Sequence, residues 1–164
     1  MSSVLAKTAL AVLAGFETLD ADALVASRAP NCIQTWAPSS CNPPQPRDNA
    51  QFAAHVAGLK SVMKGFPVHA KEVFESEKEK RVVVWATSQA MFHDELKDSS
   101  FTEEEWDYRG EYIFMFHMDA SGEKIEKVFE FLDSKGTERL RKLIARAREN
   151  RAKLGKTEAE PEWK

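Results

Sequence analysis

The sequence lacks the short motifs that would assign a reaction directly. It contains no Gly-x-Ser-x-Gly elbow of a serine hydrolase, no glycine-rich phosphate loop and no dinucleotide-binding fingerprint. Its four histidines are dispersed, without the close spacing that places two zinc ligands on one helix or strand. We therefore expect no metal site and no nucleotide-phosphate site of these kinds.

The sequence also lacks long apolar runs and a large excess of positive or negative charge, and it contains only two cysteines. No stretch is long enough to cross a bilayer, and a net charge of −3 gives no bulk attraction to nucleic acid, so we expect neither partner. We interpret residues 1–16 as a helix rather than a signal peptide, because the apolar run is short and acidic residues follow. Cys32 and Cys41 leave a local disulfide open, but we expect free thiols in a cytoplasmic protein.

The chain does contain enough apolar material for one folded domain. Hydrophobic residues make up 43% of its 164 residues and charged residues 30%, which is typical of a globular protein with a real core. We expect a single domain over residues 1–154. Residues 155–164 have no hydrophobic periodicity and are expected to form a flexible C-terminal tail.

Hydrophobic periodicity predicts a run of helices followed by a run of strands. We expect helices over residues 3–19, 21–28, 49–65 and from 134 onward, and strands over residues 31–37, 67–76, 80–93 and both arms of 106–134. Residues 38–48 carry four prolines and are expected to form a loop or lid, and residues 94–106 a polar loop. Because consecutive strands are joined by short turns, the pattern predicts an α+β fold with a mostly antiparallel sheet.

A resemblance to a known family rests on three segments. They are Cys32-Ile33-Gln34 with Pro38-Ser39-Ser40, Gly110-Glu111-Tyr112, and Gly122-Glu123-Lys124-Ile125 leading to Glu130-Phe131-Leu132-Asp133-Ser134. With the order of elements, they make residues 4–145 resemble the SnoaL-like group of the nuclear transport factor 2-like superfamily, especially small fungal isomerases and cyclases. The resembling proteins usually show Asn-Glu-Tyr where this chain has Gly110-Glu111-Tyr112, so we expect one amide to be missing from the pocket.

The resemblance implies more than a fold class. It implies a cone-shaped roll, in which a curved, mostly antiparallel sheet wraps three N-terminal helices around an apolar cavity, with a helix at the C-terminus. It also implies that no cofactor is used and that the chain forms a homodimer through the outer face of the sheet. Proteins of this fold include isomerases, cyclases, dehydratases and hydrolases as well as binding proteins, so the fold alone leaves the function open.

The polar residues of the hairpin 106–134 fall on two faces. We predict a turn at Asp119-Ala120-Ser121-Gly122 and a register that places Tyr112 opposite Glu130 and Arg109 opposite Asp133. One face then carries Tyr112, Phe114, Phe116, Val128, Glu130 and Leu132, and the other carries Arg109, Glu111, Ile113, Met115, His117, Ile125, Phe129, Phe131 and Asp133. We expect the face of Tyr112 and Glu130 to line the cavity, and Arg109 and Asp133 to form an ion pair.

The catalytic candidates are Glu130, Tyr112 and His55. A carboxyl group in an apolar cavity has its charge disfavoured, which raises its pKa toward the range of a general acid or base. Tyr112 would donate a hydrogen bond to a substrate carbonyl, and His55 lies at the buried edge of its predicted helix. As substrate-binding candidates we take Trp36, Trp85, His69, Phe114 and Asp133.

Three functions fit these residues, and whether the protein is an enzyme stays open. The first is a cofactor-free isomerase, cyclase or dehydratase that acts on an apolar, polyketide- or terpenoid-like small molecule. The second is a non-catalytic binding protein with the same cavity. The third is a dimeric interaction protein whose cavity is filled by its own aromatic side chains, and a cavity below about 300 Å³ would favour it.

Overall fold

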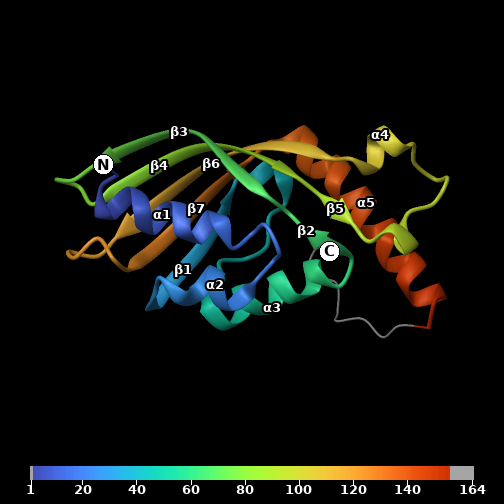
Figure 1. Cartoon of the computed structure of the whole chain (residues 1–164), viewed down its shortest axis with the longest axis horizontal. Helices are drawn as coiled ribbons and strands as arrows, with labels where there is room; N and C mark the ends of the chain where they lie inside the picture. The colour runs from blue at the N-terminus through green and yellow to red at the C-terminus, as the bar shows by residue number, and fades with distance from the viewer. Residues whose placement is uncertain (1, 156–164) are drawn as a thin grey trace.

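The computed structural model describes residues 2–155 (Figure 1). The expected tail, residues 155–164, therefore lies outside the described part except for Gly155. The elements in chain order are α1 (Val4–Ala14), α2 (Ala21–Ala26), β1 (Arg28–Ala37), η1 (Ser39–Cys41), α3 (Asn49–Lys60), β2 (Met63–Gly65), β3 (Val68–Ser76), β4 (Arg81–Gln89), β5 (Met91–Phe92), η2 (Asp94–Leu96), α4 (Glu103–Trp106), β6 (Arg109–Met118), β7 (Ile125–Leu132) and α5 (Ser134–Lys153). Among the described residues, no helix combines the length and apolar character that a membrane span requires.

The fold is a curved sheet with helices on its inner face. The five strands are ordered β1-β7-β6-β4-β3, with β1 parallel to β7 and every other pair antiparallel. In Figure 1, α1 to α3 lie under this sheet and α5 crosses one end of it. This arrangement confirms the predicted α+β cone with a mostly antiparallel sheet. Cys32 and Cys41 are both buried and unbridged, as expected.

Several predicted boundaries are wrong where tertiary contacts override the local pattern. The first helix ends at Ala14 rather than residue 19, and the third ends at Lys60 because Met63–Gly65 pairs with β5 as β2. The first strand begins at Arg28 and runs through a proline, which an edge strand tolerates because an outward-facing N–H is not needed there. The polar segment 94–106 contains η2 and α4.

The predicted hairpin register is wrong by two residues, yet the faces are right. Tyr112 lies opposite Leu132, and Phe114 lies opposite Glu130. Because side chains alternate with a period of two, a slip of two residues leaves every side chain on its predicted face. Ile125 is the exception: the register shifts after His117, and Ile125 becomes fully buried on the inner face.

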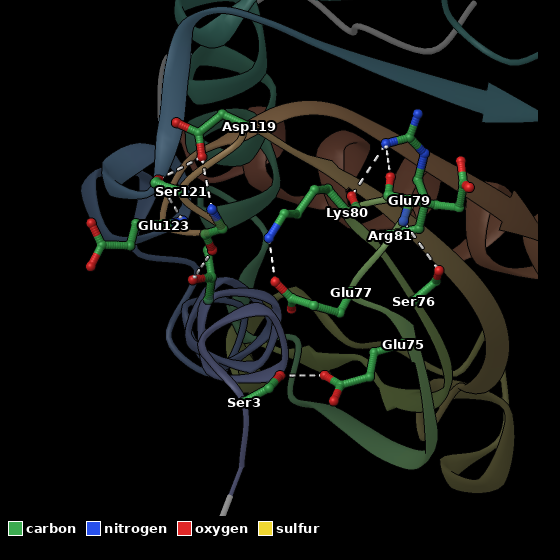
Figure 2. A network of polar contacts seen from close by, with 12 residues as sticks. Ser3, Glu75, Ser76, Glu77, Glu79, Lys80, Arg81, Asp119, Ser121 and Glu123 are labelled. Atoms are coloured by element: carbon green, nitrogen blue, oxygen red, sulfur yellow. Dashed lines mark hydrogen bonds and ion pairs between the residues drawn. The ribbon is translucent and has the colours of Figure 1, made fainter.

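The far ends of the strands are held by polar turns. Figure 2 shows the β6–β7 turn, where the Asp119 carboxylate accepts hydrogen bonds from the Ser121 hydroxyl and the Gly122 backbone N–H. Gly122 adopts a φ of 78°, a conformation that favours glycine. In the same view the hydroxyl of Ser3, which caps α1, donates to Glu75 of β3. These contacts leave the opposite end of the sheet, under α5, for the pocket.

A partly buried ion pair holds the segment between β5 and β6 against α5. The Asp98 carboxylate accepts from Arg146 Nε at 2.8 Å and Nη2 at 2.6 Å, and from Asn150 Nδ2 at 3.0 Å. The Asp98 carbonyl also accepts from the indole N–H of Trp106 at 2.9 Å. The Arg146 hydrogen bond is the main reason why the pKa of Asp98 falls far below its usual range.

We expect Asp98→Asn to lower the melting temperature by several degrees at pH 7, because a bidentate, partly buried arginine pair is lost. An acid with a depressed folded-state pKa stabilises the fold above its unfolded-state pKa. The gap between wild type and variant should thus be full at pH 7 and shrink below about pH 4. Thermal unfolding across pH measures this. Asp94→Asn is the matched control, because that exposed carboxylate contacts only surface lysines; an equal loss in both variants would contradict the prediction.

Candidate active site

A small apolar pocket lies between α3, α5 and the inner face of the sheet. It is lined by Phe16, Trp36, Phe52, His55, Leu59, Met63, Phe66, Tyr112, Glu130, Leu132, Thr137, Leu140, Arg141 and Ile144. Its free volume is about 70 Å³. That is space for a few water molecules and is well below the roughly 300 Å³ at which ligand pockets begin. In this conformation the lining side chains would have to move before a polycyclic molecule could bind.

Glu130 is the carboxylate of this pocket. It lies on β7 directly opposite Trp36 of β1 and accepts a hydrogen bond from the Trp36 side chain. Gln34 Nε2 donates to its Oε2 at 3.4 Å. Burial raises the pKa of Glu130 to about 7, and it outweighs Trp36, Arg28 and Gln34, which all favour the ionised form. Near neutral pH this group can therefore exist both as an acid and as a base.

Two buried residues behind Glu130 were not predicted. Arg28 Nη2 donates to Gln34 Oε1 at 2.7 Å, and the guanidinium lies 4.0 Å from the ring centroid of Phe52. Alternation along the predicted strand does contain a signal for Gln34, because residues 34 and 36 must share a face. Nothing in the sequence indicates Arg28, which was expected at the end of a helix.

Tyr112 is buried at the other side of the pocket within a chain of hydroxyl groups. Its hydroxyl accepts from Ser88 Oγ at 3.1 Å and lies 3.2 Å from the hydroxyl of Tyr108. Burial and the neighbouring Tyr108 raise the pKa of Tyr112 well above its usual range, so the phenol is neutral at neutral pH. Sequence reasoning missed Tyr108 and Ser88, although residues 108 and 112 are an even number apart on the predicted strand; in the structure Tyr108 directly precedes β6.

Gly110 makes room for the two tyrosine hydroxyls. It lies opposite Ser88 on the inner face of β6, and a Cβ added there would be 2.8 Å from the Tyr112 hydroxyl. The same Cβ would overlap the Tyr108 hydroxyl more severely. The hydroxyl groups of Tyr108 and Tyr112 thus occupy the space that a side chain at position 110 would fill. These hydroxyls supply polar groups at the place where the resemblance predicts that an amide is lost.

His55 reaches the pocket from α3. Its ring centroid lies 5.9 Å from that of Trp36 and 6.2 Å from that of Phe52, and the side chain is buried. Trp36 therefore connects His55 and Glu130 physically. Of the predicted site residues, the structure brings Glu130, Tyr112, His55 and Trp36 together around one pocket.

The structure places the other four predicted site residues elsewhere. Trp85 lies on the outer face of the sheet, because Val84 and Ala86 on either side of it point inward, and its indole N–H donates to Glu111 at 2.9 Å. His69 is exposed on the edge strand β3. Both predictions of pocket contact are wrong, because β4 and β3 turn these side chains away from the helices.

Phe114 and Asp133 are also absent from the pocket lining. Phe114 is on the predicted inner face but packs in the core, with its ring 6.0 Å from that of Phe116. Asp133 lies beyond β7 as the residue before α5 and borders a shallow groove on the outer face. The predicted Arg109–Asp133 ion pair is wrong as well, since the register slip separates the two residues and Arg109 pairs with Asp107 at 3.2 Å.

Comparison with known proteins gives relatives but no matching family model. The austinoid biosynthesis cluster protein H of Aspergillus calidoustus is 31% identical over 130 residues, which cover 79% of this chain and 83% of that protein. The structure of AusH from Aspergillus nidulans matches with a TM-score of 0.68 and 23% identity, over 82% of this chain and 86% of that one. BvnE pinacolase from Penicillium brevicompactum matches with a TM-score of 0.73 and 23% identity, over 88% and 96% of the two chains. Both structures share the fold described above.

Proposed function

The chain belongs to the nuclear transport factor 2-like superfamily and, within it, to the family of the austinoid biosynthesis cluster protein H, and on this premise we propose that it is a small-molecule-processing enzyme. The proposed reaction is a cofactor-free isomerisation, cyclisation or dehydration of an apolar, polyketide- or terpenoid-like molecule. The observation that carries the proposal is Glu130, a hydrogen-bonded carboxyl in an apolar pocket with a pKa of about 7. Free buried thiols at Cys32 and Cys41 support the cytoplasmic location that we also propose.

In the proposed mechanism Glu130 moves the proton. A carboxyl with a pKa near the working pH combines a useful fraction of the ionised form with a conjugate acid that can return the proton. The substrate would present an acidic C–H or a leaving hydroxyl to this oxygen. Trp36 and Gln34 hold the carboxylate from the strand beside it, so that its orientation does not depend on the substrate.

Tyr112 supplies the complementary electrophilic contact. Ser88 donates to the Tyr112 oxygen, and either hydroxyl can donate in the contact between Tyr108 and Tyr112. In the proposed arrangement Tyr108 is the donor, which leaves the Tyr112 proton for a ligand in the pocket. A neutral phenol in a buried site stabilises negative charge that develops on a carbonyl oxygen without prior reorganisation. In this mechanism Glu130 transfers the proton, and Tyr112 stabilises the negative charge that develops on the substrate.

Entry of a ligand requires movement at the side covered by α5. Arg141 lines the pocket, and its Nη2 donates to the carbonyl of Asn42 in the proline-rich loop at 3.2 Å. This contact joins the wall of the pocket to the loop of residues 38–48. We propose this loop as the lid, and its displacement together with Leu140 would enlarge the pocket.

Proton exchange tests the function even while the natural substrate is unidentified. A panel of apolar cyclic ketones is incubated with the protein in deuterium oxide, and exchange of the protons next to the carbonyl is followed by NMR. We expect exchange above the buffer rate for ketones that bind. Binding without exchange would instead support a non-catalytic binding protein, and absence of binding across the panel would contradict both.

The small free volume favours a second candidate, an interaction protein of the same fold, and the outer sheet face offers the surface. Two rows of apolar side chains cross this face: Phe74, Val83, Met115 and Phe129 form one, and Trp85, Ile113 and Phe131 form the other. Phe74 is 57% exposed and Phe131 46% exposed. Apolar patches of this extent mark interaction sites more often than ordinary surface.

The charges beside the apolar rows fit a second copy of the chain. Arg81, His117 and Lys127 lie side by side along one margin, whereas Glu111 and Asp133 lie along the other. A two-fold axis that lies in the interface, parallel to the sheets and perpendicular to the strands, would place each basic margin against the partner's acidic margin. We propose a homodimer through this face, compatible with either candidate function.

We expect Phe131→Glu to shift the protein to a monomer, because burial of an unpaired charge in the interface is costly. Molar mass by light scattering across a concentration series measures the change. Leu154→Glu is the matched control, since that leucine is 54% exposed at the end of α5, away from the sheet face. A dimer in both variants, or a monomeric wild type, would contradict the proposed interface.

A further inference from the structure

A buried arginine lies behind the wall of the pocket. Arg28 is only 5% exposed, at the junction of α2 and β1. Its Nε donates to the carbonyl of Leu24 at 3.1 Å, and its Nη2 donates to Gln34 Oε1 at 2.7 Å. Nη1 is buried and makes no hydrogen bond with any described residue. A buried charge with an unmade hydrogen bond destabilises a fold relative to an apolar side chain of similar size, so stability alone does not account for it.

Gln34 transmits this contact to the carboxylate. Its side chain is 1% exposed, and its backbone forms two hydrogen bonds with Arg47, at 2.8 and 2.9 Å. Arginine can only donate, so the amide oxygen of Gln34 must face Arg28 and its NH₂ group must face Glu130. Arg28 therefore decides which end of the amide meets the carboxylate, and the donated hydrogen bond joins Gln34 Nε2 to Glu130 Oε2.

We infer that Arg28 and Gln34 are positioning residues, which fix the carboxylate of Glu130 from behind the pocket wall without contacting the ligand themselves. Arg28 does not line the pocket and neither does Gln34. The planar guanidinium suits this task because it bridges the Leu24 carbonyl and the Gln34 amide in one fixed geometry, which a lysine cannot reproduce. The purpose of this arrangement rests on the proposed function of Glu130, but its existence is testable without a substrate.

The other titratable groups around Glu130 come from several elements. Tyr108 and Tyr112 approach from the side of β6, His55 lines the pocket from α3, and Arg141 lines it from α5. Cys32 lies beside Arg28 on β1. None of these titratable side chains is substituted in the Arg28 and Gln34 variants, so we attribute a shift in the titration of Glu130 to the two positioning residues.

The test is the titration of Glu130 followed by carboxyl ¹³C NMR in protein labelled at glutamate, with the signal assigned by its loss in Glu130→Gln. We expect the wild-type midpoint near pH 7. Gln34→Leu and Arg28→Met should each raise the midpoint by about 0.5–1 pH unit, a threefold to tenfold rise in proton affinity, because each removes an interaction that favours the ionised form. Arg28→Lys keeps the charge but not the bridge, and should give a smaller rise.

Matched controls separate positioning from general damage. Thr35→Val changes the neighbouring residue of the same strand, and Arg109→Met removes an exposed arginine from β6. Neither should move the midpoint. Folding is checked by circular dichroism, and if Arg28→Met does not fold, Gln34→Leu and Arg28→Lys decide the question.

A midpoint unchanged from wild type in folded Gln34→Leu would overturn the inference, even if the variant were less stable. The failure of the proposed function looks different. In that case Glu130→Gln would leave proton exchange unchanged, whereas the titration shifts in the Gln34 and Arg28 variants would still appear.

Discussion

Glu130→Gln is expected to reduce exchange of ketone α-protons by at least about a hundredfold, the usual contribution of a positioned general base. Glutamine keeps the shape of the side chain and can still meet Trp36 and Gln34, but it cannot take up a proton. Because the ionised carboxylate is the base, the wild-type rate should fall as pH drops below about 7 and level off above it. This pH dependence should vanish in the variant.

The matched control is Glu111→Gln, which makes the same change on the opposite face of the sheet, where Glu111 accepts from Trp85. We expect its exchange rate to equal that of wild type. If both variants keep the wild-type rate, Glu130 has no part in the reaction and the binding or interaction candidates gain support. If both lose activity equally, the loss reflects the fold rather than the pocket.

Stability should move in the opposite direction to activity. The folded-state pKa of Glu130 lies above the ordinary value of 4.5. The free energy of unfolding of wild type should therefore fall as pH rises from about 4.5 to 7, because the buried carboxyl must ionise, and it should stay lowered above pH 7. Glutamine is neutral throughout this range. We thus expect the free energy of unfolding of Glu130→Gln at pH 8 to exceed that of wild type by roughly 1–3 kcal/mol, as measured by denaturant unfolding. At pH 4 we expect no difference. A variant that is less stable than wild type at pH 8 would show that burial does not disfavour the ionised form of Glu130.

Gly110→Ala has the second largest expected effect. The added Cβ would overlap the Tyr108 hydroxyl and lie 2.8 Å from that of Tyr112, so the two phenols must separate or the strand must shift. Overpacking of a core usually costs about 1–3 kcal/mol. Loss of the hydroxyl chain should also reduce proton-exchange activity by roughly tenfold or more, if Tyr112 stabilises the developing charge. Denaturant unfolding and the ketone exchange assay measure the two effects.

A second glycine and a double variant make this prediction specific. A Cβ at Gly58, in the last turn of α3, would meet only Arg148 Nη2 at 3.8 Å, so Gly58→Ala should stabilise the helix by up to about 1 kcal/mol. Tyr108→Phe removes the atom that overlaps most, so Gly110→Ala should cost less in that background than in wild type. Equal costs in both backgrounds would mean that the alanine acts elsewhere.

The hairpin illustrates how far alternation along a strand can be trusted. The pattern placed Glu130 and Tyr112 on the inner face correctly, although their predicted partners were wrong, because an error of two residues conserves the face. Trp85 shows the limit of residue type as a guide, since its size and aromatic character suggested a pocket wall. Burial of its smaller neighbours Val84 and Ala86 turned Trp85 outward instead.

The residues that were missed share a physical cause. Arg28 and Gln34 become important only because β1 pairs in parallel with β7, a contact between segments about a hundred residues apart. Ser88 and Tyr108 join Tyr112 because β4 lies beside β6 and because Gly110 leaves the space between them. Local alternation indicates the face on which Gln34 and Tyr108 lie, but it does not indicate which residues of distant strands they meet.

From the sequence alone, the α+β class and the faces of the long strands could be predicted, since both follow from short-range periodicity. Residue chemistry named Glu130, Tyr112, His55 and Trp36 as candidates, but it named them together with four residues that the structure places outside the pocket. The tertiary structure alone decided that burial raises the pKa of Glu130 to about 7, that a buried arginine lies behind it and that the pocket holds only about 70 Å³. Those properties depend on desolvation and packing, which arise when distant segments meet and exclude water.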